Sequence, residues 1–187
     1  MKVISLIAAL LIMVSSITYA QSKKVDIKKS IIEWKGEKVT GEHSGTILFK
    51  SGELAFKDSK LTGGEFVVDM TSITNTDLTD EEYNKKLVGH LKSDDFFGVA
   101  TYPESTLELT SVKAKGEAYE VNGKLTIKGK THPIAFEVTE ADGVFTGVMK
   151  VDRTKYDVRY GSGKFFDNLG DKVIYDEFTL TFKVFTN

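Results

Sequence analysis

From Ser30 onward, apolar and polar residues alternate along most of the chain, and this pattern constrains the fold more than any other feature. A period of two places successive side chains on opposite faces of a strand, so each segment should bury one face. The clearest apolar positions are Leu54, Phe56, Phe66, Val68, Met70, Leu107, Leu109, Leu125, Ile127, Ile134, Phe136, Val138, Phe145, Met149, Val151, Phe178, Leu180, Phe182 and Val184. We therefore predict an all-β protein of eight or nine strands.

Glycine, serine and aspartate mark the turns between these strands. We expect turns at residues 50–52, 57–60, 115–116, 128–130 and 141–143. Asn122-Gly123 is typical of a tight hairpin, but a turn there would leave two stubs between Gly116 and Gly129. We therefore predict one continuous strand from about Glu117 to Lys128, with allowance for a β-bulge.

One segment departs from the alternation and predicts a short helix. Thr79 is the expected N-cap, Glu82 completes a capping box, and Leu78 is placed to pack on Tyr83. The apolar face of this helix consists of Tyr83, Leu87 and Leu91. We expect the helix to end near Lys92 and to lay that face on the rim of the sheet.

Many consecutive antiparallel strands with a single helix suit a closed up-and-down barrel or a sandwich. Closure removes free strand edges. An eight-stranded barrel is just wide enough to be filled by side chains or to hold one small ligand. The residues alone therefore predict an all-β fold with one short helix, either a barrel or a sandwich, and for a barrel the central question is whether its interior is filled or hollow.

The first 20 residues have the order of a secretory signal peptide. Lys2 precedes an apolar run from Val3 to Val14, and Ala20 stands at the expected cleavage point. The alternative is a membrane anchor, but this run is shorter than the roughly 20 residues that span a bilayer. We expect cleavage after Ala20, a periplasmic or secreted product, and one domain over residues 21–187.

Composition excludes several classes of function. The chain has no cysteine, so it has no cysteine to acylate, no disulfides and no thiolate chemistry. Cleavage would remove Lys2 from 25 basic residues and none of the 27 acidic ones, which leaves a net charge of −3. An acidic surface with interspersed charges does not indicate binding to nucleic acid or to an anionic membrane. We expect a soluble protein without a stable membrane anchor.

Several motifs occur in an order that resembles one family. They are Ile32-Glu33-Trp34-Lys35-Gly36, Gly64-Glu65-Phe66, Asp69-Met70-Thr71-Ser72-Ile73, His90-Leu91-Lys92-Ser93-Asp94-Asp95-Phe96-Phe97, Tyr102-Pro103, Leu125-Thr126-Ile127-Lys128-Gly129 and Asp152-Arg153. Together they resemble the YceI-like family of bacterial polyisoprenoid-binding proteins over essentially the whole chain after the signal. The most specific motif is the His-Leu-x-Ser-x-Asp-Phe-Phe run followed by Tyr-Pro.

The resemblance implies an antiparallel eight-stranded lipocalin-like β-barrel with one short helix. It also implies that the barrel carries or stores a long isoprenoid or similar lipid, in a periplasmic or secreted protein that can form homodimers. The chain departs from true lipocalins because it lacks cysteines and a Gly-x-Trp signature at Trp34. No lipocalin residue role is therefore transferred to it.

With the resemblance added, the inward apolar stripe is predicted to line a ligand tunnel; the alternative is that it simply fills the barrel. The predicted ligand-binding residues are Trp34, Phe49, Phe66, Val68, Met70, Phe97, Leu107, Leu109, Phe136, Phe145, Met149, Phe165, Phe178, Leu180 and Phe182. Each buried methylene contributes about 0.8 kcal/mol. Ten of them give roughly 8 kcal/mol before ordering costs, which corresponds to about micromolar affinity.

The segment from Thr154 to Lys172 lacks alternation and is long for a loop, which favours a lid or a binding loop. The aromatic residues outside the strands are Phe96, Phe97, Tyr102, Tyr160, Phe165 and Phe166. We predict that they form a gate at one mouth, with Gly161 and Gly163 giving the loop its freedom. The alternative is that these rings plug the barrel end as packing.

Few residues suggest catalysis or metal binding. The chain has three histidines, His43, His90 and His132. Their spacing does not resemble a metal site, and neither a metal nor a cofactor is expected. His90 near Asp94 and Asp95 suggests acid–base chemistry, but no nucleophile motif accompanies them. We expect His90 and Asp95 to hold the helix exit, and Arg153 to pair with one of these acids.

Two alternatives to a lipid-binding function remain open. A lipid-modifying enzyme would need convergent polar groups at the tunnel, and the sequence offers few. A stress-related or adhesive interaction protein with a packed interior would need an exposed apolar patch, whereas the outward strand positions are mostly Lys, Glu and Thr. The sequence therefore favours a binding protein that is not an enzyme.

Overall fold

A computed structural model of the protein describes residues 20–187. The predicted signal peptide, residues 1–20, lies outside the described residues except for Ala20. The strands are β1 (Ala20–Lys24), β2 (Ile31–Lys38), β3 (Gly41–Lys57), β4 (Lys60–Asp69), β5 (Glu104–Lys115), β6 (Ala118–Ile127), β7 (Lys130–Ala141), β8 (Val144–Asp152) and β9 (Ile174–Phe185). The helix is α1 (Glu81–Lys92), and 3₁₀-helices span Met70–Ser72, Arg153–Tyr156 and Gly170–Lys172.

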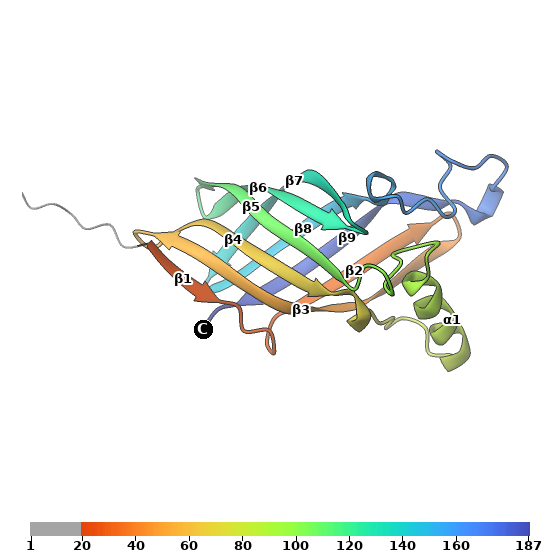
Figure 1. Cartoon of the computed structure of the whole chain (residues 1–187), viewed down its shortest axis with the longest axis horizontal. Coiled ribbons are helices and arrows are strands. Elements are labelled where there is room, and N and C mark those ends of the chain that lie inside the picture. The colour runs from red at the N-terminus through yellow and green to blue at the C-terminus, as the bar shows by residue number, and fades with distance from the viewer. Residues whose placement is uncertain (1–19) are drawn as a thin grey trace, which may run out of the picture.

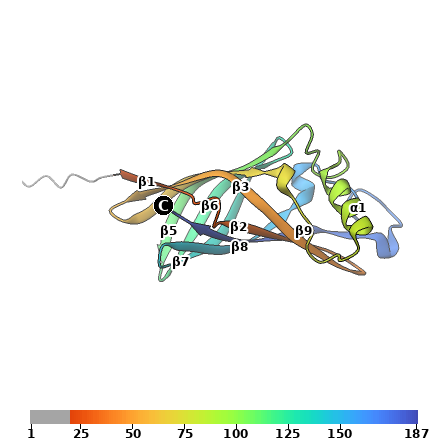
Figure 2. The same cartoon turned by 90° about the horizontal axis from the view of Figure 1, so that it is seen from below.

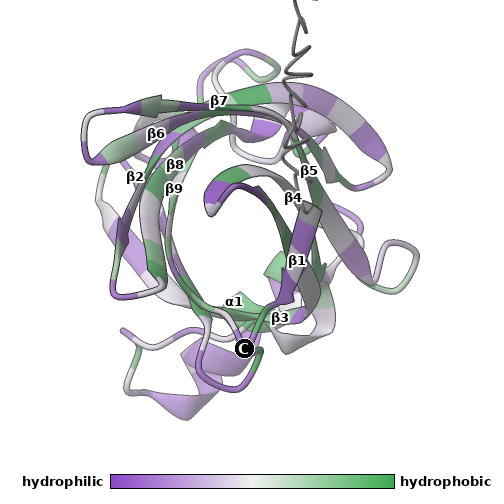
Figure 3. Ribbon diagram, turned by 90° about the vertical axis from the view of Figure 1, so that its left-hand side faces the viewer, coloured by the Kyte–Doolittle hydropathy of each residue, from purple (hydrophilic) through white to green (hydrophobic). Residues whose placement is uncertain are grey.

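Strands β2 to β9 close into an antiparallel barrel, which confirms the predicted fold class. Their order is β3-β2-β9-β8-β7-β6-β5-β4, and pairing of β4 with β3 closes the ring. Figure 3 shows this ring along the long axis of the molecule. Strand β1 pairs with the end of β3, beyond the stretch of β3 that pairs with β2. The eight barrel strands are therefore joined by one short additional strand.

The length of β3 is what allows closure. Its first half pairs with β2 and its second half with β4, and the register shifts between Phe49 and Ser51. The predicted turn at residues 50–52 is therefore wrong, because these residues form a bulge within a continuous strand. A Cβ added at Gly52 would lie 2.7 Å from a Val25 methyl carbon and 2.9 Å from the Phe66 ring. Glycine at this position serves close packing, not a turn.

The other four predicted turns are confirmed as connections between neighbouring strands. The turns at 58–59, 128–129 and 142–143 each place both central residues at positive φ, the backbone conformation of a type I′ hairpin. Strand β6 runs uninterrupted through Asn122-Gly123, as predicted. The bulge lies on the neighbouring strand β5, between Leu109 and Ser111.

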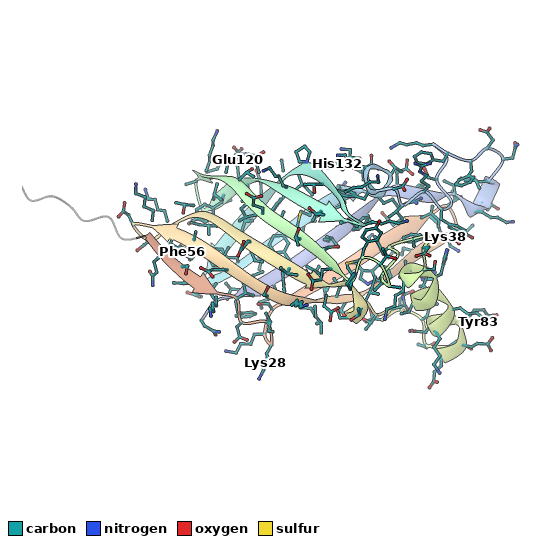
Figure 4. The ribbon with its side chains drawn as sticks, viewed as in Figure 1. Lys28, Lys38, Phe56, Tyr83, Glu120 and His132 are labelled. Carbon is teal, nitrogen blue, oxygen red and sulfur yellow. The ribbon has the colours of Figure 1, made fainter. Side chains whose placement is uncertain are left out.

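Helix α1 ends at Lys92 as predicted but begins one residue later than expected. Asp80, not Thr79, is the N-cap, and its carboxylate accepts hydrogen bonds from the backbone N–H groups of Glu82 and Tyr83. Aspartate is at least as good an N-cap as threonine, which explains the shift. The Tyr83 side chain is 63% exposed and points away from the barrel (Figure 4), so only Leu87 and Leu91 of the predicted face pack inward.

The two ends of the barrel differ. Figures 1 and 2 place α1 and the segment between β8 and β9 at one end, with β1 toward the other. The hairpin turns at 58–59 and 142–143 lie at the β1 end. We refer to the two as the helix end and the hairpin end.

No helix within residues 20–187 has both the length and the apolar character needed to cross a membrane.

Candidate ligand-binding interior

The barrel contains two adjoining apolar cavities. The first, of about 80 Å³, lies toward the hairpin end, and the second, of about 120 Å³, lies toward the helix end. The first is lined by Ile32, Phe49, Leu54, Leu61, Phe66, Val68, Ser105, Thr106, Leu107, Leu109, Leu125, Phe136, Val138, Phe145, Met149, Leu180, Phe182 and Val184. The second is lined by Ile32, Trp34, Gly36, Ile47, Val68, Met70, Ile73, Leu91, Phe96, Phe97, Ser105, Leu125, Ile127, Arg153, Ile174, Tyr175, Phe178 and Leu180.

Five residues line both cavities, and we call them the waist. They are Ile32, Val68, Ser105, Leu125 and Leu180, from β2, β4, β5, β6 and β9. Because the same side chains bound both spaces, the cavities succeed one another along the barrel axis. An apolar cavity of about 150 Å³ stays dry and binds benzene, so the interior has room for part of an apolar chain.

Fourteen of the fifteen predicted ligand-binding residues line at least one of these cavities. The exception is Phe165, which among the described residues lines neither cavity. Its ring is 43% exposed and lies 4.9 Å from the guanidinium carbon of Arg159. Phe165 follows β8 by more than ten residues, where the alternation carries no information about which way a side chain points.

Several lining residues were absent from the prediction. Leu125, Ile127, Val138 and Val184 belong to the alternating pattern, and Ile32 stands two residues before Trp34, so the period of two could have identified them. Ser105 has the same parity as Leu107 and Leu109 but is polar. A search for apolar positions therefore passes over it.

Arg153 closes the helix end from within. Its side chain is 2% exposed and borders the second cavity. The guanidinium donates four hydrogen bonds of 2.8–3.0 Å, to the backbone carbonyls of Val158, Tyr160, Ile174 and Tyr175. Burial lowers the pKa of Arg153, and the negative charges of Asp176 and Asp152 act in the opposite direction. Arg153 therefore fastens the loop after β8 to the start of β9.

The predicted pairing of Arg153 with Asp94 or Asp95 is wrong. Its acidic neighbour is Asp176, with Nη2 3.8 Å from Oδ1. Strands β8 and β9 are antiparallel neighbours that pair up to Asp152 and Glu177, which brings Arg153 beside the start of β9. Asp94 instead follows α1, where its carbonyl accepts a 2.8 Å hydrogen bond from Lys128 Nζ.

Charged residues form a collar outside Arg153. Lys164 Nζ lies 3.2 Å from Oδ2 of Asp152 and 3.2 Å from Oδ2 of Asp176. Burial would raise the pKa of Asp152, but hydrogen bonds from Thr154 and Lys164 outweigh it and hold that pKa below its usual range. The ion pairs attach the middle of the long loop to β8 and β9.

Five of the six aromatic residues of the predicted gate fall into an inner and an outer group. Phe96 and Phe97 are buried, pack edge to face and line the second cavity. Tyr160, Phe165 and Phe166 are exposed on the long loop. The His90 ring packs against both groups, with ring centroids 5.6 Å from Phe96 and 4.4 Å from Tyr160.

Tyr102, the sixth aromatic residue, belongs to neither group. A Cβ added at Gly129 would lie 2.9 Å from its ring, so it packs over the β6–β7 turn. At the loop, Tyr160 and Phe166 also border an open polar pocket of about 330 Å³ with Asp94, Asp95, Lys128, Asp157 and Arg159. Within residues 20–187, no three His, Asp or Glu side chains are grouped closely enough to hold a metal ion.

An eight-stranded barrel with an apolar interior belongs to the class of small barrels that can enclose one ligand, as lipocalins do. Residues 23–185 match the YceI-like domain, so the chain belongs to the YceI-like family, and the predicted resemblance is confirmed. Protein YceI of Escherichia coli O157:H7 is 34% identical over 93 residues, which are 50% of this chain and 46% of that protein. The chain thus spans about half the length of the curated relatives it matches.

Solved structures share the fold over most of the chain. The crystal structure of Burkholderia cenocepacia BcnA aligns with 86% of this chain, and the alignment includes 98% of the BcnA chain. The TM-score is 0.67 and the sequence identity is 27%. A polyisoprenoid binding domain from Saccharophagus degradans, implicated in plant cell wall breakdown, covers 88% of this chain and 97% of its own. Its TM-score is 0.63 and its identity 18%. At that identity the second likeness shows the fold alone.

Proposed function

We propose that this protein is an exported binding protein that carries or stores an isoprenoid, or a similar long-chain amphiphilic lipid, inside its barrel. The observation that carries the proposal is the pair of apolar cavities joined at the waist. Membership of the YceI-like family supports this ligand class, and the domain from Saccharophagus degradans, which shares the fold, is itself described as polyisoprenoid binding. The hydrophobic effect alone can supply the affinity, since about ten buried methylenes correspond to roughly micromolar binding.

The polar groups around the cavities favour binding over catalysis, because the described lining includes no His, Asp or Glu that could act as a base beside the Ser105 hydroxyl. The indole N–H of Trp34 donates to the carbonyl of Thr74 at 2.9 Å, and Arg153 is engaged with four carbonyls. Groups held in this way shape the site and are not free to attack a substrate or move a proton. We therefore propose a carrier or store, not an enzyme.

Export is the second part of the proposal, and it rests on the order of residues 1–20. Cleavage after Ala20 would remove only the first residue of β1, so the pairing of β1 with β3 would remain. N-terminal sequencing of the protein from a periplasmic or culture fraction should begin at Gln21. An uncleaved chain confined to the cytoplasm would contradict export without bearing on lipid binding.

A substitution at the waist tests binding directly. Leu180 lines both cavities, so Leu180→Trp should obstruct the interior, whereas Thr181→Trp on the same strand adds the same ring to the exposed face. We expect the native chain and Thr181→Trp to bind cis-parinaric acid, with geranylgeraniol as competitor. Leu180→Trp should bind at least about tenfold more weakly, which is about 1.4 kcal/mol. Equal binding by all three proteins would place the lipid outside the barrel and contradict the proposal.

A further inference from the structure

Ser105 is a polar residue at an inward position of an otherwise apolar wall. It begins the inward stripe of β5 that continues with Leu107 and Leu109, and it lies opposite Val68 of β4. Its side chain is 6% exposed and borders both cavities, so it belongs to the waist. Alanine or valine would continue the apolar stripe at this position, so the hydroxyl needs an explanation.

The hydroxyl of Ser105 lacks a partner. Within residues 20–187, Ser105 Oγ and Asp176 Oδ1 are the two buried side-chain oxygen or nitrogen atoms without a hydrogen bond. A buried hydroxyl left unpaired is destabilising, because folding removes its hydrogen bonds to water without replacing them. Two other polar groups beside the second cavity, Trp34 Nε1 and the Arg153 guanidinium, already donate to backbone carbonyls. Ser105 is therefore the one member of the waist whose side chain has hydrogen-bonding capacity that no described group uses.

We propose that the Ser105 hydroxyl binds an uncharged oxygen, a carbonyl or hydroxyl, that lies within the bound lipid and is flanked by apolar groups on both sides. This inference rests on the proposed lipid-binding function. Because Ser105 stands between the two cavities, an oxygen at the waist has apolar space ahead of it and behind it. A serine hydroxyl can donate one hydrogen bond and can also accept hydrogen bonds, so it can pair with either a carbonyl or a hydroxyl oxygen.

The surroundings of the waist exclude a charged group. Its other four members are Ile32, Val68, Leu125 and Leu180. A carboxylate or phosphate there would be desolvated among aliphatic side chains with one hydroxyl to stabilise it, which is costly. Arg153 borders the second cavity alone, nearer the helix end. The waist therefore favours a ketone, ester, quinone or alcohol oxygen over an ionised head group.

A series of positional isomers tests the assignment. The probes are hexadecane and hexadecanones with the carbonyl at C2, C4, C6 or C8, each titrated against bound cis-parinaric acid. On the native chain, one carbonyl position should bind about fivefold more tightly than the others, as expected for one hydrogen bond. Ser105→Ala should lose that preference yet bind hexadecane at least as tightly as the native chain does. Ser105→Thr, which keeps the hydroxyl, should retain the preference.

The matched control is Ser111→Ala. Ser111 follows the β5 bulge and pairs with Asn122 on the outward face, so its loss should leave the preference unchanged. If every probe binds the native chain equally and Ser105→Ala behaves identically, an internal water or nothing satisfies Ser105, and the assignment is overturned while lipid binding stands. If none of the probes displaces cis-parinaric acid, the proposed function itself fails. The comparison among isomers on the native chain does not depend on any variant folding.

Discussion

Nη2 of Arg153 lies 3.8 Å from Oδ1 of Asp176, beyond hydrogen-bond distance, while the same guanidinium donates to four backbone carbonyls. The carbonyls, rather than the carboxylate, are therefore its principal partners. Oδ1 of Asp176 is buried and lacks a hydrogen bond within the described residues, while Oδ2 pairs with Lys164. This arrangement makes Arg153 the residue on which the geometry of the helix end most depends.

Replacement of Arg153 by alanine should destabilise the protein by about 3 kcal/mol or more, because it leaves buried carbonyls without donors and removes the cation beside the buried Oδ1 of Asp176. Urea unfolding followed by circular dichroism measures this change. Arg159→Ala is the matched control, since Arg159 is more than half exposed and pairs with Asp157 at the surface. Its expected cost is below about 1 kcal/mol. Equal effects of the two substitutions would show that the buried network contributes little.

Gly45 is required by a close approach between β3 and the segment after β4. A Cβ at this position would overlap the carbonyl oxygen of Thr74 and lie 2.8 Å from the Trp34 ring. We expect Gly45→Ala to lower the free energy of unfolding by about 1–3 kcal/mol through overpacking. Gly36→Ala is the control, because a Cβ there meets none of the described atoms within 4 Å. Thermal denaturation of both variants decides the point, and an unchanged Tm for Gly45→Ala would contradict it.

Tyr156 should make the protein sensitive to alkaline pH. Burial, and then the charge of Asp152, raise the pKa of Tyr156 from its usual 10.0 to about 12. A phenol with a raised pKa contributes its full stability below pH 10, and the contribution is lost as pH rises through 12. Tyr156→Phe should therefore show a shallower loss of stability between pH 10 and 12 than the native chain. Parallel pH profiles of the two proteins would refute this assignment.

We predict that the exposed rings of Phe165 and Phe166 act as a gate, although neither lines either cavity of the described barrel. Serine at both positions should change the rates of cis-parinaric acid uptake and release, as followed by stopped-flow fluorescence. The equilibrium affinity should change by less than about twofold, since neither ring contacts either cavity in the described residues. Tyr83→Ser serves as control, because it removes an exposed ring on α1 that lies outside the long loop. Unchanged rates in the double variant would leave Phe96 and Phe97 as a static plug and end the gate hypothesis.

The alternation of side chains predicts the strands and most of the residues that face the interior, because strand geometry ties sequence parity to a face of the sheet. Closure into a barrel, rather than a sandwich, follows from the family resemblance. The alternation could not distinguish a turn from a bulge at Lys50-Ser51-Gly52, since the same residues suit both. The alternation also fails to identify Ser105. Its position matches the inward parity of Leu107 and Leu109, but a search for apolar residues excludes a serine.

The long loop was the least predictable part of the molecule. The loop has no periodic pattern that could place Phe165. The acidic partner predicted for Arg153, which directly precedes the loop, is wrong. Its true partners are backbone carbonyls of the loop and β9, and residue types alone do not reveal a carbonyl acceptor. Long-range pairing of β8 with β9 determines them.

If the protein carries a lipid, one lipid chain should occupy the barrel interior. Native mass spectrometry of the protein purified without detergent, followed by mass analysis of its organic extract, measures this occupancy. We expect one apolar lipid per barrel that is lost on extraction, and its absence or marked reduction in Leu180→Trp. Native protein that carries no lipid and takes none up when supplied with geranylgeraniol would rule out lipid carriage in the barrel.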